Sequence, residues 1–398
     1  MKTDLRKNAE KIGRLCFWTA FVTELLIVIV EKSAYTNPAE SWLFRITFVL
    51  FCIKILTTEY TRAEWIVILT AGALASTAYW INERDEVVRA AVFVIACKNI
   101  DLKKMYRVIL SITAAGSIVL FILAAAGIFG SLAMTADFGR GAVETRYCFG
   151  MGHPNSFSSM LLMMSTGVIY LYLAGKGDEE ISDKGLRIKM SAVICAVYGF
   201  NVLCFVFTDS NTALIVVTAF SAGVLAMIWS RHLRTGRFAY IAGAAVFVTI
   251  VLFSMYGAKV GNETPVMYRL DKILNGRFQY SYIFEDARIG NWKLFAAPEN
   301  QEYFDQGFIR LFYWYGVIPA AAYIGANLFL IIQSYRKRDY ALLVTVVAYA
   351  VFTIMEAHLI SVYLLRNYLL VLLGYYWYQP FRDTGQHLEN AGNEIIRS

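Results

Sequence analysis

The fold of this chain is decided by stretches such as residues 212–230, which read TALIVVTAFSAGVLAMIWS. The run contains no charged residue, and Asp209 and Arg231 lie just outside it. A helix rises about 1.5 Å per residue, so a helix of this length reaches across the hydrocarbon core of a bilayer, which is about 30 Å thick. The run therefore predicts a membrane-spanning helix.

Similar runs recur along the chain. Hydrophobic residues make up 58% of the sequence and charged residues 17%, whereas soluble domains have about 25% charged residues. The mean hydropathy is +0.50. We predict an all-α polytopic membrane protein, a single integral membrane domain over residues 1–398, with about twelve transmembrane helices. The expected spans are 15–31, 42–57, 65–80, 87–97, 106–129, 152–174, 190–208, 212–230, 239–255, 311–334, 341–357 and 359–378.

Basic residues are concentrated in alternate loops of this arrangement. The basic N-terminus is followed by loops with Lys98, Lys103 and Lys104, with Lys176, Lys184 and Arg187, with Arg231, Arg234 and Arg237, and with Arg336, Lys337 and Arg338. Short basic loops remain on the cytoplasmic side of a membrane. We therefore predict that both termini are cytoplasmic.

The longest segment on the opposite side, residues 256–310, is predicted to be a large extracellular loop with a short amphipathic helix. Thr264 suits the cap of this helix, Pro265 its first position and Gly276 its end. Apolar residues recur between them at helical spacing, at Met267, Leu270, Ile273 and Leu274. Such a helix lies along the membrane surface, although a structured loop that covers the bundle is an equal alternative.

Arginines occur near the outer ends of the predicted spans, against the usual charge bias. Arg45, Arg89 and Arg366 lie inside spans, where each costs at least about 2.5–3.5 kcal/mol on insertion scales. The outer loops contain Arg140, Arg146, Arg269, Arg277, Arg288 and Arg310. Snorkelling accounts for any single one of them. Together they predict an anionic ligand at the outer face, such as a lipid-linked phosphate or pyrophosphate.

Other polar residues mark the same boundary. Asp209 ends the seventh span, and Glu356 is expected to pair with Arg366, one span away. Pro154 suits the first turn of a helix, which places His153 at the helix N-terminus. His153 is then either a helix cap or a group that accepts a proton or binds a phosphate oxygen. Glu24, in the middle of the first span, is expected to be ion-paired or hydrogen-bonded rather than a proton relay.

Three motifs resemble the Wzy-type polysaccharide polymerases of Gram-positive bacteria, in the O-antigen polymerase/ligase superfamily. Residues 146–155 read RYCFGMGHPN, like the family's arginine, glycine-rich turn and His-Pro-Asn. Residues 274–277, LNGR, resemble its Gly-Arg motif in the large outer loop. Residues 305–308, DQGF, with YGVI at 315–318, resemble its Asp-Asn-x-Tyr and Tyr-Gly ending. Asp209 stands in a segment where many members carry an arginine.

The resemblance implies a GT-C-like protein of the bacterial plasma membrane with its active site on the outer face. Such a polymerase transfers a growing glycan from polyprenyl pyrophosphate to a sugar hydroxyl of the next lipid-linked repeat unit. The expected catalytic residues are His153, Arg146 and Arg277. The expected substrate-binding residues are Arg45, Arg89, Asn155, Asp209, Arg269, Asp305, Arg310, Glu356 and Arg366. The expected partners are the lipid-linked oligosaccharide, membrane lipid, and flippase and chain-length regulator proteins.

Three alternatives remain open at this stage. A ligase of the same superfamily moves a finished glycan to another acceptor, and a flippase or transporter moves the lipid-linked oligosaccharide itself. A non-catalytic scaffold of an envelope-assembly machine is the third. The histidines lack metal-ligand spacing and no P-loop motif occurs, so neither a metal, nor another cofactor, nor nucleic acid is expected.

Overall fold

The computed structural model describes residues 2–138, 141–299 and 302–382, which are mostly helical. A two-stranded antiparallel hairpin is formed by β1 (Ala133–Asp137) and β2 (Val143–Tyr147). The longer helices are α1 (Lys2–Lys32), α2 (Glu40–Leu56), α3 (Arg62–Asn82), α4 (Glu86–Ala96), α5 (Leu102–Ala125), α6 (Pro154–Leu173), α8 (Lys184–Thr208), α9 (Asn211–Trp229), α11 (Arg237–Val260), α15 (Val317–Lys337) and α16 (Tyr340–Met355). The shorter ones are α7 (Asp178–Ser182), α10 (Arg231–Thr235), α12 (Pro265–Ile273), α13 (Arg277–Ile283), α14 (Gly307–Tyr315) and α17 (Tyr368–Tyr376), with 3-10 turns η1 (Glu285–Ala287), η2 (Ile289–Asn291), η3 (Ala357–Leu359) and η4 (Leu364–Arg366).

Among the described residues, eight helices are long and apolar enough to cross a membrane. They are residues Leu5–Lys32 of α1, and α3, α5, α6, α8, α9, α11 and α15. The chain is therefore an all-α polytopic protein, as the apolar runs predict. The other four predicted spans correspond to the shorter helices α2, α4, α16 and α17.

Side-chain caps begin several of these helices. The Thr61 side chain accepts from the backbone N–H of Glu64, and the Glu64 side chain accepts from that of Thr61, so α3 begins with a capping box. The side chains of Asp101, Asp183 and Asp339 each accept one backbone hydrogen bond and so cap α5, α8 and α16. These bonds satisfy backbone donors that would otherwise be unpaired at the helix ends.

Two predicted spans differ from continuous helices. Gly316 has φ 94° and separates α14 from α15, so the tenth span, 311–334, is broken. A Cβ at Gly316 would lie 2.6 Å from the backbone nitrogen of Ala296, so the close approach requires glycine. The twelfth span, 359–378, has irregular backbone up to Asn367, whose side chain caps α17. Irregular backbone at membrane depth is tolerated where it is buried or lines a cavity, and this segment does line one.

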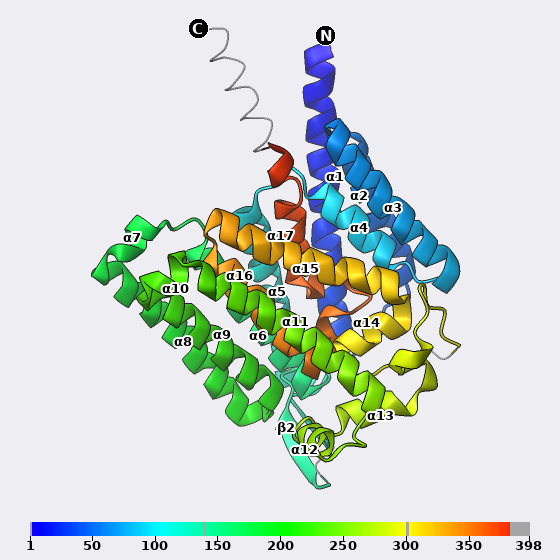
Figure 1. Cartoon of the computed structure of the whole chain (residues 1–398), viewed down its shortest axis with the longest axis vertical. Helices are drawn as coiled ribbons and strands as arrows, with labels where there is room; N and C mark the ends of the chain where they lie inside the picture. Colours follow the sequence, from blue (N-terminus) through cyan, green and yellow to red (C-terminus); the bar gives the residue numbers. More distant parts are fainter. Residues whose placement is uncertain (1, 139–140, 300–301, 383–398) are drawn as a thin grey trace.

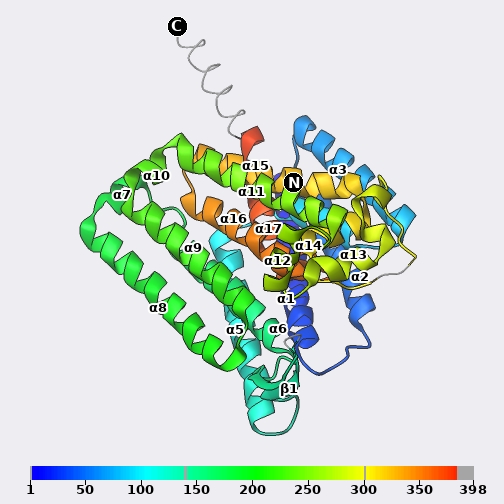
Figure 2. The same ribbon diagram turned by 60° about the horizontal axis from the view of Figure 1, so that its bottom comes forward.

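The centre of the bundle is formed by α6 and α16, both largely buried. The hydroxyl groups of Thr166 and Tyr349 form a hydrogen bond between these two helices. At the outer edge, α8 and α9 run side by side, with α7 and α10 at their shared end (Figures 1 and 2). Two of the cavity residues described below, His153 and Glu356, therefore lie directly at the ends of these buried helices.

The basic loops converge at one end of the bundle. One cavity there is lined by Lys103, Lys176, Arg234 and Lys337, together with Gln379 beyond α17. Arg6, near the N-terminus, lines a neighbouring cavity with Lys98. From this end α1 runs 31 residues to Lys32, a length of about 45 Å, which is enough to cross a bilayer with its headgroups. The other end of α1, which Figure 1 shows far from the N-terminus, therefore lies at the opposite face, and Lys32 is its last residue.

Residues 261–306 connect α11 to α14 and contain the predicted short helix. The Thr264 side chain accepts from the backbone N–H of Met267, and Pro265 is the first residue of α12. Met267 is buried, whereas Leu270 and Ile273 are exposed. Asp271 is buried as well, because its carboxylate accepts hydrogen bonds from the backbone N–H groups of Phe278 and Gln279. The loop thus has its own packed structure.

The first prediction concerns orientation. Cysteine at Glu263, which is exposed beyond α11, should react with an impermeant thiol reagent in intact cells. Cysteine at Glu179, which is exposed on α7 at the basic end, should react only after the cells are opened. The positive-inside tendency is the reason for this difference. The parent chain supplies the background labelling, and the reverse pattern would place the Lys32 face in the cytoplasm.

Candidate functional site

A polar cavity of about 610 Å³ lies at the face opposite the basic loops. Six of the predicted site residues line it: His153, Asn155, Asp305, Arg310, Glu356 and Arg366. Other polar residues also line it; they are Glu31, Lys32, Ser156, Ser159, Tyr303, His358, Ser361 and Tyr363. These side chains come from the end of α1, the start of α6, the segment before α14 and the segment between α16 and α17.

His153 occupies the N-cap position of α6, immediately before Pro154. Its Nδ1 atom accepts a hydrogen bond from the backbone N–H of Asn155 at 3.1 Å. A ring nitrogen that accepts carries no proton, so this bond assigns the proton of the neutral ring to Nε2. His153 therefore offers an Nε2–H donor to a ligand. A general-base role at Nε2 would require the other tautomer and would remove the cap.

One side of the cavity, which we call the acidic wall, is formed by Glu356 and Asp305, and Arg277 pairs with both of them from outside the cavity lining. The Nη2 atom of Arg277 donates to Glu356 Oε1 at 2.8 Å, and its Nε atom lies 3.5 Å from Asp305 Oδ2. The side-chain amide of Asn155 also donates to Glu356 Oε1, at 3.2 Å. Two carboxylates thus share one guanidinium group, which leaves this wall with excess negative charge.

The other side, which we call the basic wall, is formed by Lys32, Arg366 and Glu31. The Lys32 Nζ atom lies 3.6 Å from Glu31 Oε2, and Arg366 forms an ion pair with the same oxygen. Arg366 also donates to the Ser361 hydroxyl at 3.3 Å. Here two cations share one carboxylate, which leaves excess positive charge.

The expected pairing of Glu356 with Arg366 is therefore wrong. Glu356 pairs with Arg277 and Arg366 pairs with Glu31. The physical reason is that Glu31, at the end of α1, supplies the carboxylate that the sequence analysis did not consider. Arg277 and Arg366 therefore belong to separate ion pairs, while Lys32 is near enough to Glu356 for their charges to interact.

Burial changes the pKa of the two central groups in opposite directions. It lowers the pKa of His153, and nearby Arg146 and Lys32 add to this effect while Asp305 opposes it. Burial raises the pKa of Glu356, because the desolvation cost exceeds the stabilisation of its charge by Arg277. His153 is therefore neutral near pH 7, and Glu356 titrates closer to neutrality than an ordinary glutamate.

Arg146 lies beside the cavity rather than in its lining. Its guanidinium forms ion pairs with Glu144 at 2.6 Å and Asp209 at 3.3 Å. It also lies over the Phe138 ring at 4.3 Å, and the same ring contacts His153 at 5.7 Å between centroids. The hairpin thus places Arg146 beside the site, where it pairs with Asp209 at the end of α8.

Four other predicted arginines have different surroundings. Arg45 is exposed and lies over the Trp42 ring, and Arg269 is exposed on α12. Arg89 is buried beside Glu24 at 3.6 Å and Asp85 at 3.2 Å, so it stabilises the packing of α1 with α4. Arg310 lines the cavity but donates to the backbone carbonyls of Phe304 and Ile360, which fixes two segments of its wall. Arg140 lies outside the described residues.

No protein-family model, curated protein or solved structure matches this chain. The site therefore has to be interpreted from its own geometry. Within the described residues, no group of three or more His, Cys, Asp or Glu side chains is placed to hold a metal ion.

The missed residues Glu31 and Lys32 carried a sequence signal. They form an adjacent charged pair at the end of the first apolar run, on the face that the sequence predicts to be external, where basic residues are disfavoured. His358 also carried a signal, since it lies beside Glu356 at the predicted outer end of a span, and the irregular segment after α16 brings it into the cavity.

Proposed function

We propose that the chain is a Wzy-type polymerase that extends a lipid-linked glycan in this cavity. The observation that supports it best is the separation of charge into a basic wall and an acidic wall within one cavity. Glycosyl transfer from a lipid pyrophosphate produces negative charge on the leaving group and requires removal of a proton from the acceptor hydroxyl. The basic wall would stabilise the charge on the leaving group, and the acidic wall would accept the proton.

The basic wall would receive the pyrophosphate of the donor. When the bond between the anomeric carbon and the phosphate oxygen breaks, the electron pair leaves with the pyrophosphate. Lys32 and Arg366 are cations that stabilise the developing charge, and the His153 Nε2–H donates a hydrogen bond without adding charge. Because these groups are held in place before the reaction, little reorganisation is needed.

The acidic wall would receive the acceptor sugar. As the acceptor oxygen forms the new bond to the anomeric carbon, Glu356 takes its proton. Both hydrogen bonds to Glu356 within the described residues reach Oε1. We therefore assign the acceptance of the proton to Oε2. A carboxyl group with a raised pKa is a stronger base than an ordinary glutamate and suits catalysis near neutral pH.

A ligase is the second candidate, because the same two walls serve the transfer of a finished glycan to another acceptor. The two reactions share the donor chemistry and differ only in the acceptor. A flippase is less well supported, because its binding site would lie near the bilayer midplane, whereas this cavity lies at the end of α1.

The second prediction tests the proposal in cells that lack the chain. We expect them to accumulate a single repeat unit on the lipid at the outer surface, and the parent chain to restore the polymer. Lipid-linked glycans extracted from each strain give the measurement. Full-length polymer retained on lipid would indicate a ligase, and units retained inside the cell would indicate a flippase.

A further inference from the structure

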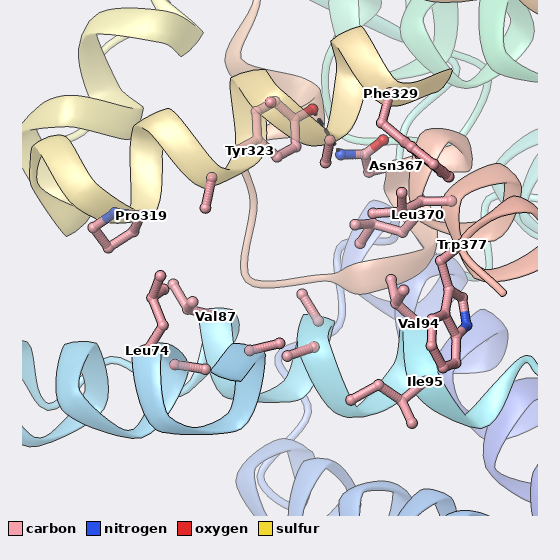
Figure 3. A pocket seen from close by; sticks show the side chains of 18 of the residues that line it. Leu74, Val87, Val94, Ile95, Pro319, Tyr323, Phe329, Asn367, Leu370 and Trp377 are labelled. Carbon is pink, nitrogen blue, oxygen red and sulfur yellow. Dashed lines mark hydrogen bonds between the residues drawn. The ribbon is translucent and has the colours of Figure 1, made fainter. Parts of the chain in front are cut away.

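An apolar groove of about 700 Å³ runs along the bundle between α15 on one side and α3 and α4 on the other. In Figure 3, Tyr323 and Phe329 of α15 lie opposite Val87 and Val94, and Leu370 of α17 and Trp377, which follows α17, close one end. Small residues on both walls leave the space between them unfilled by side chains; they are Ala71, Ala75, Ala90, Ala91, Ala322, Gly325 and Ala326. The Asn367 amide in the groove already donates to the Tyr323 hydroxyl at 3.0 Å. An occupant therefore needs no polar group at that point.

The groove and the polar cavity share one wall. Leu359, Ile360 and Leu364 of the irregular segment line the groove, whereas His358, Val362, Tyr363 and Arg366 of the same segment line the cavity. Ser361 lines both. The two spaces therefore adjoin at Ser361, so the head of an amphipathic molecule at the basic wall would lie next to a tail in the groove.

The length of the groove indicates which apolar chain fits it. Its lining on α15 extends from Pro319 to Arg336, which corresponds to about 25 Å of helix. A phospholipid acyl chain reaches only across one leaflet, about half of the roughly 30 Å hydrocarbon core. A groove of this length suits a longer chain that continues past the midplane.

We infer that this groove binds the isoprenoid chain of the lipid-linked donor, with its pyrophosphate at Lys32 and Arg366. The inference rests on the proposed function for the identity of the head group. Its physical basis is Ser361, which lines both spaces, the length of the groove, and the positive charge of Lys32 and Arg366 in the adjoining cavity.

Gly325 offers a specific way to test it. A Cβ added at Gly325 meets no atom within 4 Å, and Gly325 lines the groove, so Gly325→Trp should fill the groove without disturbing the helices. Gly199 on α8 is the matched control, because a Cβ there also meets no atom within 4 Å and Gly199 does not line the groove.

The experiment uses the full chain in nanodiscs and a sugar-free polyprenyl pyrophosphate with a photoreactive group on its tail. We expect photolabelling of α3, α4 and α15, and Gly325→Trp should lower it about tenfold or more, since several buried methylene contacts are lost. The Gly199→Trp variant should be photolabelled to the same extent as the parent chain. Labelling that Gly325→Trp leaves unchanged would overturn the inference.

A second labelling experiment uses a photoreactive phospholipid in place of the polyprenyl pyrophosphate. If it labels the groove equally well and polyprenyl pyrophosphate does not displace it, the groove holds ordinary bilayer lipid and the inference is wrong. The probe carries no sugar, so its binding is measured separately from transfer. A chain that labels as expected but extends no glycan would contradict the proposed function alone, whereas an active chain without labelling would contradict the groove alone.

Discussion

Glu356→Gln is expected to lower glycan extension about a hundredfold or more, in line with general-base contributions of roughly 10²–10⁴. The amide oxygen can still accept from Arg277 and Asn155, so the acidic wall keeps its geometry while the proton acceptor is lost. The measurement is the rate at which purified chain extends a lipid-linked repeat unit. Glu263→Gln, at an exposed position between α11 and α12, is the control and should extend the glycan at the parent rate.

The pH dependence gives a second readout for the same residue. Only the deprotonated carboxylate accepts a proton, so activity should rise with pH as Glu356 loses its proton. Because burial raises the pKa of Glu356, this rise should occur above the pH range of an ordinary glutamate. Glu356→Gln should remove this rise. If the variant keeps both the parent rate and the parent pH profile, Glu356 serves only to hold Arg277.

His153→Asn is expected to lower extension about a hundredfold, the scale measured for loss of one donor to a developing anion. Asparagine is a good N-cap residue, so it can replace Nδ1 as the acceptor for the α6 backbone. Its shorter side chain cannot supply the Nε2–H donor on the far side of the ring. Thermal stability and the amount of inserted protein should therefore match the parent, and only transfer should fall.

His153→Ala serves as the comparison. It removes the cap as well as the donor, so it should lose about 1 kcal/mol of stability in addition to activity. A His153→Asn chain that extends glycan at the parent rate would show that His153 is a helix cap, and the donor role would then fall to the basic wall alone.

The local features of this protein could be predicted from the sequence because their causes are local. Apolar runs such as 212–230 predict helices, since backbone groups inside a bilayer must be paired within the segment. Thr264 with Pro265, and His153 with Pro154, predict helix starts that the structure confirms, because a cap involves only a few neighbouring residues. The basic loops gather at one end of the bundle for the same kind of reason, since each follows the end of one span.

The breaks in the predicted spans required tertiary information. Gly316 ends α14 because the chain of residues 294–296 passes close to it, and nothing in the local pattern of 311–334 signals that contact. The segment 356–367 is as apolar as many helices. It stays irregular because carbonyl groups such as that of Ile360 are satisfied by Arg310, which lies 50 positions earlier.

The number of outer arginines predicted an anionic site, but only the tertiary structure decided which charges meet. Arg277 reaches Glu356 across 79 positions, and Asn155 reaches it across 201. The strength of such pairs depends on distance and on burial, and neither quantity can be obtained from the order of residues along the chain. The sequence by itself thus determined a polytopic helical protein with a histidine at a helix start and basic loops at one end. The fold decided that Lys32 and Arg366 form one wall of a cavity, that Glu356 and Asp305 form the other, and that an apolar groove meets them at Ser361.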